Sequence, residues 1–303
     1  MDWTTQLDNW MKNNGLRYDC DEPMSRHTFF RIGGPARRMA YPDSEAQLAA
    51  LLEAAEGFGI EPLVIGNGSN LLVADAGLDR LVIDTSAAMN EMEEGEEGRI
   101  SAGAGVVLAR LADYACRLSL TGLEFAHGIP GTLGGAVCMN AGAYGGEMSH
   151  VLESARVYIP GEGVKTLSLP ELKLGYRESI FIDNPRLVVL GATVRLQKGD
   201  PESIREQMRD LMARRKASQP LEYPSAGSTF KRPAGHFAGA LIEGSGLKGF
   251  TVGGAQVSEK HAGFVINTGG ATCADVTELI RRVQEIVFEK TGVRLEPEVR
   301  IIG

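Results

Sequence analysis

The distribution of glycine is the feature that most constrains this chain. It contains 38 glycines among 303 residues, well above the usual share of roughly 7%. They gather in discrete clusters, and the longest cluster, Gly128 to Gly146, reads GIPGTLGGAVCMNAGAYGG. Its apolar residues need burial, so it is not a linker. Because bare backbone allows close approach, we expect either a groove for an elongated, phosphate-bearing ligand or a tight helix–sheet contact.

A second glycine cluster, GNGSNLLV, covers residues 66–73 between two apolar runs that read as strands. Consecutive N–H groups in such a turn can bind an anion, and Asn67, Ser69 and Asn70 add donors without negative charge. An ordinary hairpin turn is the alternative. Leu71 stands where a Rossmann fingerprint needs glycine, and no stretch matches a P-loop. Two uncharged glycine clusters together favour one extended ligand with a pyrophosphate, as in a dinucleotide.

The length suggests two or three domains, and the composition, with 43% hydrophobic and 23% charged residues, is that of a globular protein. A net charge of -8 argues against nucleic acid as a partner. The four cysteines form no C-x-x-C and the five histidines show no ligand spacing, so we expect no metal site. Reduced thiols indicate the cytoplasm. We find neither a signal peptide nor an apolar run long enough to span a membrane.

Helical periodicity predicts helices near residues 3–14, 43–57, 107–118, 200–216 and 276–292. Strict alternation predicts a strand over residues 293–302. It would place Val293, Leu295, Val299 and Ile301 on one face and Arg294, Glu296, Glu298 and Arg300 on the other. After Gly199 the sequence changes to the amphipathic helical pattern of residues 200–216, which predicts a domain boundary near residue 200.

Three short motifs carry candidate chemistry. In PSAGSTF, residues 224–230, Phe230 stands where a hydrolase nucleophile motif needs glycine, so Ser228 is not that kind of nucleophile. In LGYRES, Arg177 could hold a carboxylate or an enolate by two hydrogen bonds, although a solvated pair with Glu178 is the simpler interpretation. In LEPEV, Glu296 and Glu298 share a strand face, and a solvated edge is again the simpler interpretation.

Six motifs occur in a familiar order: GNGSNLLV, GIPGTLGGAVCMNAGAYG, GYRESIF, AGSTFKRP, GLKG and LEPEVRIIG. From His27 to Gly303 the chain resembles the family of UDP-N-acetylenolpyruvoylglucosamine reductases. The resemblance implies a cytoplasmic, FAD-dependent oxidoreductase. Such an enzyme uses NADPH to reduce UDP-N-acetylglucosamine-enolpyruvate to UDP-N-acetylmuramate in peptidoglycan synthesis.

The resemblance also implies an α+β fold: a vanillyl-alcohol-oxidase-type FAD-binding fold of two subdomains and a C-terminal α/β substrate-binding domain. We expect the subdomains at residues 1–90 and 91–200 and the third domain at residues 201–303. The compact run from Gly175 to Asp200 resembles the branch that lacks an extra tyrosine-bearing loop. No stable protein partner is implied.

Residue by residue, the resemblance implies a catalytic set. Reduced flavin would pass hydride to C3 of the enolpyruvyl group, Ser228 would protonate C2, and Arg177 and Glu298 would stabilise the enolate. Substrate contacts would come from Tyr176, Lys216, Lys231 and His261. Arg232 departs from members with asparagine at that position. Residues implied to surround non-covalent FAD are Gly66, Asn67, Gly68, Ser69, Asn70, Leu71, Gly128, Pro130, Gly131, Thr132, Gly134, Gly135, Asn140, Gly142, Ala143 and Tyr144.

Two other functions stay open on these residues. One is another FAD oxidoreductase of the same superfamily, acting on an alcohol or a sugar. The other is a nucleotide-binding protein without catalysis on the same scaffold. Flavin absorbance and NADPH oxidation would separate them.

Overall fold

The computed structural model describes residues 2–303, which form two compact units. Each unit is assembled from three separate segments. The first contains the residues up to Cys20 together with Arg37–Asn67 and Arg80–Ala213; the second contains Asp21–Ala36, Gly68–Asp79 and Arg214–Gly303. The three domains expected from the sequence stay a prediction.

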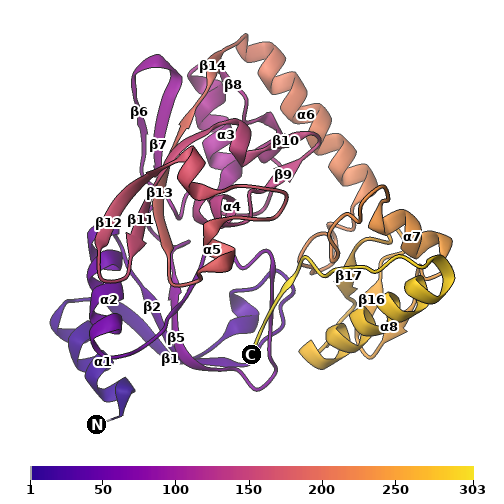
Figure 1. Cartoon of the computed structure of the whole chain (residues 1–303), viewed down its shortest axis with the longest axis horizontal. Coiled ribbons are helices and arrows are strands. Elements are labelled where there is room, and N and C mark those ends of the chain that lie inside the picture. The colour runs from indigo at the N-terminus through magenta and orange to yellow at the C-terminus, as the bar shows by residue number, and fades with distance from the viewer. Residues whose placement is uncertain (1) are drawn as a thin grey trace. The chain divides into compact units, whose positions relative to one another are not determined.

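The first unit is built on two sheets (Figure 1). One has the strand order β12-β11-β13-β7-β6 and is antiparallel throughout. The other has the order β1-β2-β5-β3, in which β3 and β5 are parallel. Short pairs β9–β10 and β8–β14 complete the strands. Their bounds are β1 Arg17–Pro23, β2 Pro35–Tyr41, β3 Leu63–Ile65, β5 Leu78–Asp84, β6 Met92–Glu94, β7 Arg99–Gly103, β8 Leu120–Thr121, β9 Gly142–Ala143, β10 Gly146–Glu147, β11 Leu152–Ile159, β12 Gly163–Ser168, β13 Val188–Arg195 and β14 Gln197–Lys198.

Helices form where capping residues and apolar periodicity predict them. In the second helix, Ser44 accepts a hydrogen bond from the N–H of Gln47, and Leu48, Leu51, Leu52 and Ala55 are buried. This confirms the prediction for residues 43–57. The helices of this unit are α1 Trp3–Asn13, α2 Glu45–Gly57, α3 Leu108–Arg117, α4 Leu133–Cys138, α5 Ile180–Asp183 and most of α6 Pro201–Ser218.

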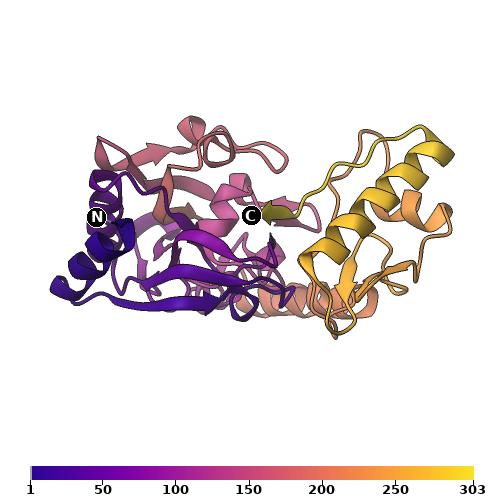
Figure 2. The same ribbon diagram turned by 90° about the horizontal axis from the view of Figure 1, so that it is seen from below.

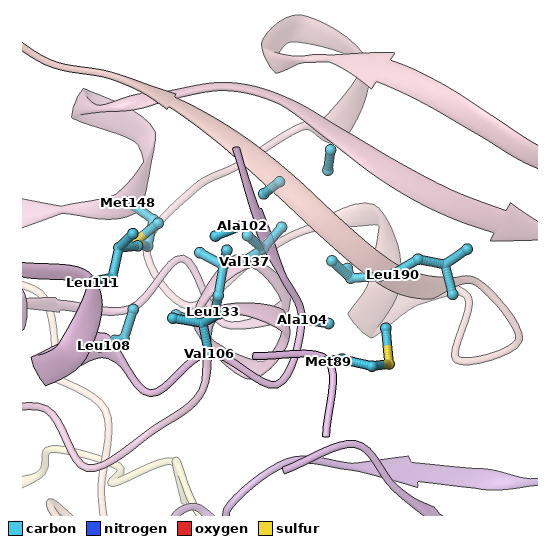
Figure 3. Packing of buried hydrophobic residues seen from close by; sticks show 14 of the residues in the cluster. Met89, Ala102, Ala104, Val106, Leu108, Leu111, Leu133, Val137, Met148 and Leu190 are labelled. Carbon is cyan, nitrogen blue, oxygen red and sulfur yellow. The ribbon is translucent and has the colours of Figure 1, made fainter. Parts of the chain in front are cut away.

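Helix α4 was not predicted, because its sequence LGGAVC is dominated by residues of poor helix propensity. It forms because Leu133 and Val137 are fully buried and pack beside Val106 and Ala102 (Figure 3). The N–H of Leu133 also donates to the carbonyl of Val106 at 2.8 Å. Tertiary packing therefore overrides propensity in the middle of the long glycine cluster.

The second unit has its own core around α8, and Figure 2 shows the helices and strands of its C-terminal part in orange and yellow. Helix α8 packs on α7 and on the antiparallel sheet β15-β16-β17. The final strand β18 pairs with β4 in parallel, so Arg300 faces Leu71. The elements are β4 Leu71–Val73, α7 Ala238–Gly244, β15 Thr251–Val252, β16 Ala255–Val257, β17 Val265–Asn267, α8 Cys273–Thr291 and β18 Arg300–Ile302.

The predicted strand over residues 293–302 is wrong in its extent and partly wrong in its facing. Only Arg300–Ile302 is a strand. Leu295 and Val299 are buried as expected, but Ile301 is 46% exposed. Residues 296–298 pair with the segment around Phe230, whereas residues 300–302 pair with β4. The segment therefore changes its partner between Glu298 and Arg300, and the alternation does not continue beyond Val299.

Two features are absent from the described residues. No helix of residues 2–303 is long and apolar enough to cross a membrane. Over the same residues, histidine, cysteine, aspartate and glutamate form no group of three that could hold a metal ion.

Candidate active site

In the first unit, the start of the motif GNGSN lies directly against the long glycine cluster. The side-chain amide of Asn67 donates to the carbonyl of Pro130 at 2.9 Å. A Cβ on Gly66 would lie 2.0 Å from Oγ1 of Thr132, which is 1% exposed. Glycine is therefore required at residue 66, and the structure brings together two clusters that are more than 60 residues apart in the sequence.

The hairpin interpretation of GNGSN is wrong. Strand β3 pairs with β5, whereas β4 pairs with β18, so the strands on either side of the motif do not pair with each other. Gly68 has φ +58, and a Cβ there would lie 2.0 Å from the carbonyl oxygen of His27. Within residues 2–303, the backbone N–H groups of Asn67, Gly68 and Ser69 donate to no backbone or side-chain acceptor. Such successive donors suit an anion.

The two adjacent glycines of α4 differ in their surroundings. A Cβ on Gly134 would lie 2.9 Å from the Cβ of Ala104, inside the core. Gly135 is exposed, and a Cβ there would find only Oγ1 of Thr132, at 3.8 Å. Gly134 is thus needed for packing within the protein, whereas the space beside Gly135 is open to a ligand.

The tip of the glycine cluster is a two-residue hairpin. Gly146 pairs with Ala143 across it, and Tyr144 and Gly145 at its tip have φ +53 and φ +88. Two consecutive left-handed residues are characteristic of the tight turns that join antiparallel strands. Tyr144 is 46% exposed there, so its ring is available to a ligand.

Arg177 lies in a tight turn in the same unit. Gly175 and Glu178 exchange backbone hydrogen bonds of 3.1 and 3.3 Å, which leaves Tyr176 and Arg177 at the tip. Arg177 has φ +57, a left-handed conformation that is uncommon for a residue with a side chain. Its guanidinium donates to the carbonyls of Asn140 and Gly142 at 3.3 and 3.4 Å and lies over the Tyr176 ring.

Asn140 fixes this turn, a role that the sequence did not reveal. It is fully buried, and its side-chain amide donates to the carbonyl of Gly175 at 2.9 Å. Its Oδ1 accepts the N–H of Ser149 at 2.9 Å, and its amide also contacts Glu147. The hydrogen bond from the Ser149 hydroxyl, more than the charge of Arg177, holds the pKa of Glu147 below its usual range.

In the second unit, the segment PSAGSTF has a strand-like partner on each side. Ser228 forms a β-bridge with Phe264, and the N–H of Thr229 donates to the carbonyl of Gly263 at 2.8 Å. On the other side, the N–H of Glu298 donates to the carbonyl of Thr229 at 2.8 Å, and Phe230 bridges Pro297. Two of the predicted catalytic residues, Ser228 and Glu298, therefore lie on neighbouring segments.

Ser228 and its neighbour Thr229 have different roles. The side chain of Thr229 is 2% exposed, and its hydroxyl accepts the N–H of Val265 at 2.9 Å. Ser228 is exposed, and its hydroxyl has no hydrogen-bond partner within residues 2–303. Of the two adjacent hydroxyls, Ser228 is thus the one that is available for chemistry.

The three residues of this unit that were predicted to contact substrate differ in their partners within the structure. Lys231 forms an ion pair with Glu296, whereas the Lys216 ammonium has no partner among residues 2–303. Nδ1 of His261 accepts the N–H of Gly263 at 3.1 Å, and burial lowers the pKa of His261. The acceptor role requires an unprotonated Nδ1, so the neutral ring carries its proton on Nε2.

Two family models match separate parts of this chain. Residues 36–168 match the family model of an FAD binding domain, and residues 219–302 match that of the C-terminal domain of UDP-N-acetylenolpyruvoylglucosamine reductase. The reductase of that name from Clostridium perfringens is 50% identical over 283 residues, which are 93% of this chain and 92% of that protein. The one from Agathobacter rectalis is 51% identical over 294 residues, with 93% of each chain covered.

Solved structures agree with the sequence comparisons. UDP-N-acetylenolpyruvylglucosamine reductase from Thermus caldophilus is 35% identical, with a TM-score of 0.80 over 95% of this chain and 99% of that chain. BBE-like 1 from Physcomitrella patens is 14% identical, with a TM-score of 0.50 over 63% of this chain and 44% of that chain, and shows the fold alone. The expected α+β FAD-binding fold is confirmed. The chain belongs to the UDP-N-acetylenolpyruvoylglucosamine reductase family.

Proposed function

We propose that this FAD-dependent oxidoreductase uses NADPH to reduce UDP-N-acetylglucosamine-enolpyruvate to UDP-N-acetylmuramate, the step of peptidoglycan synthesis performed by its family. The observation that carries the proposal is the hydrogen bond between the main chains of Thr229 and Glu298, which places the segment of Ser228 next to the segment of Glu298. The hydroxyl of Ser228 is exposed and has no hydrogen-bond partner within residues 2–303. A proton donor next to a group that stabilises an enolate is what reduction of an enolpyruvyl double bond requires.

The residues present fit FAD. The glycine clusters carry free backbone N–H donors at Asn67, Gly68 and Ser69, open space beside Gly135, and no acidic side chain that would repel a pyrophosphate. FAD supplies hydride when it is bound and reduced. The chain offers donors and close backbone approach, and GNGSN contains no histidine to which a flavin could be attached. We therefore propose non-covalent FAD held by the residues named for it above, with Asn70 contributing through its main chain because its side-chain amide donates to the carbonyl of Glu298.

The chain's own residues would stabilise the negative charge and deliver the proton. Hydride arriving at C3 of the enolpyruvyl group leaves negative charge at C2 and on the carboxylate. Arg177 would stabilise that charge by two hydrogen bonds, and Glu298 would donate one if it is protonated. Ser228 would deliver its proton to C2, and Arg177, Glu298 or a nearby lysine would stabilise the resulting alkoxide.

Substrate recognition would depend on local positive charge, because the net charge of the chain is -8. Lys216, whose ammonium has no partner among residues 2–303, is suited to the acidic substrate. Lys231 would have to exchange Glu296 for a ligand. Tyr176 and His261 would add contacts through a 49% exposed ring and a neutral imidazole. All four cysteines are free thiols, which suits the proposed cytoplasmic location.

Anaerobic stopped-flow absorbance tests the proposal with Ser228→Ala. NADPH should bleach the flavin as fast in the variant as in the parent. Reoxidation by UDP-N-acetylglucosamine-enolpyruvate should be slower by about 100-fold, within the range that a positioned acid contributes. Equal loss in both half-reactions would refute the proton-donor role. A purified protein without flavin absorbance would favour the non-catalytic alternative, and reduced flavin that is not reoxidised by this substrate would favour another flavin oxidoreductase.

A further inference from the structure

The main chain of Glu298 is held from two sides in the second unit. On one side its N–H donates to the carbonyl of Thr229 at 2.8 Å. On the other side its carbonyl accepts the side-chain amide of Asn70 at 3.1 Å. Asn70 is the last polar residue of GNGSN and lies 228 residues earlier in the chain. Both peptide groups that flank the α-carbon of Glu298 are therefore fixed.

Asn70 contacts the C-terminal segment through a second hydrogen bond. Its own main-chain carbonyl accepts the N–H of Arg300 at 3.0 Å. The parallel ladder between β4 and β18 starts at the next pair, Leu71 with Arg300. That ladder covers residues 300–302 and does not reach Glu298. The side chain of Asn70 thus extends the pairing by two residues, past Val299, to the glutamate itself.

We propose that Asn70 is a positioning residue for Glu298, and that its side chain acts in the reaction through that glutamate. The inference rests on the proposed role of Glu298. It gives the motif GNGSN two tasks: the N–H groups of Asn67, Gly68 and Ser69 face a cofactor anion, while the Asn70 side chain sets the carboxylate that works on the substrate. A disturbance of this turn would then reach the reaction without loss of FAD.

The variant Asn70→Ala tests the side-chain bond. It removes the amide that Glu298 accepts but keeps the main-chain bond to Arg300 and the ladder that follows. The loss of one such hydrogen bond costs about 1 kcal/mol, so the fold should persist. A catalytic group misplaced by about 1 Å can lose up to ~100-fold in rate. We expect the second half-reaction to be about tenfold slower.

A double-mutant cycle with Glu298→Gln tests the mechanism. The parent, Asn70→Ala, Glu298→Gln and the double variant are compared for flavin content, for flavin reduction by NADPH, and for reoxidation by UDP-N-acetylglucosamine-enolpyruvate. If Asn70 acts through Glu298, Asn70→Ala slows reoxidation about tenfold in the parent and less than twofold in the Glu298→Gln background. Flavin content and the NADPH step stay within twofold of the parent.

Asn67→Ala is the matched control, because the same type of side chain in the same motif donates instead to Pro130. Its effect should be the same in both backgrounds. A tenfold loss from Asn70→Ala that persists in the Glu298→Gln background, no loss at all, or an equal loss in the NADPH step would each overturn the positioning role. If Glu298→Gln alone leaves reoxidation unchanged, the proposed role of Glu298 fails instead, and the inference falls with it.

Discussion

Alanine substitution of two adjacent glycines in α4 can distinguish packing within the protein from contact with the cofactor. A Cβ on Gly134 would lie 2.9 Å from the Cβ and 3.3 Å from the carbonyl oxygen of Ala104. Overpacking of this kind costs about 1–3 kcal/mol. Replacing glycine by alanine in a helix stabilises the folded protein by about 0.5–1 kcal/mol. The cost of the clash exceeds the gain in the helix, and we expect Gly134→Ala to lower the free energy of unfolding by roughly 1 kcal/mol.

Gly135→Ala should have the opposite effect on the protein alone. A Cβ there is 3.8 Å from Oγ1 of Thr132, which is ordinary contact, and the residue is exposed. Only the helix gain of about 0.5–1 kcal/mol remains. If FAD passes over this part of α4, the added methyl occupies its space. We then expect FAD affinity to fall about tenfold, which is ~1.4 kcal/mol.

Two assays on the same proteins decide the matter. Urea unfolding of the FAD-free variants measures stability, and titration with FAD, followed by quenching of flavin fluorescence, measures affinity. Stability of Gly134→Ala equal to or above that of the parent would refute the packing argument. FAD affinity of Gly135→Ala within twofold of the parent would show that the cofactor does not pass beside Gly135. Gly57→Ala, with nothing within 4 Å of its Cβ, is the control for both assays.

Two further predictions concern the second unit. The carboxylate of Asp75 accepts the N–H groups of Cys273 and Ala274, in the first turn of α8, at 2.8 and 3.1 Å. Asp75→Ala should therefore lower the free energy of unfolding, measured with urea, by about 1–2 kcal/mol. A change below about 0.3 kcal/mol would show that Asp75 does not cap this helix. Burial, and then the charge of Lys248, lower the pKa of His261 below its ordinary value of 6.5. The unfolded chain therefore takes up the proton first, and this contribution to stability, present above about pH 6.5, is lost as the pH falls toward the lowered pKa. His261→Gln should flatten the fall in unfolding free energy between about pH 7 and 5, and an unchanged slope would contradict the assignment.

The sequence predicted the elements whose signals are local. Ser44 ahead of a periodic apolar stripe was sufficient for α2, because a cap and a buried face act within one helix. It could not predict α4, whose helix exists only because Leu133 and Val137 are buried in the core. Nor could alternation predict that Ile301 is exposed, because that depends on how β18 pairs with β4.

The candidate site divides in the same way. The residue types, their order along the chain and the glycine clusters were readable in the sequence, and they were enough to indicate the family and its cofactor. Which residues contact each other was decided by the tertiary structure: Gly66 against Thr132, Asn140 under the turn of Arg177, and Asn70 on the main chain of Glu298. A side-chain pattern reports burial along one element, whereas these contacts join segments that only folding brings together, and no local periodicity encodes the partner.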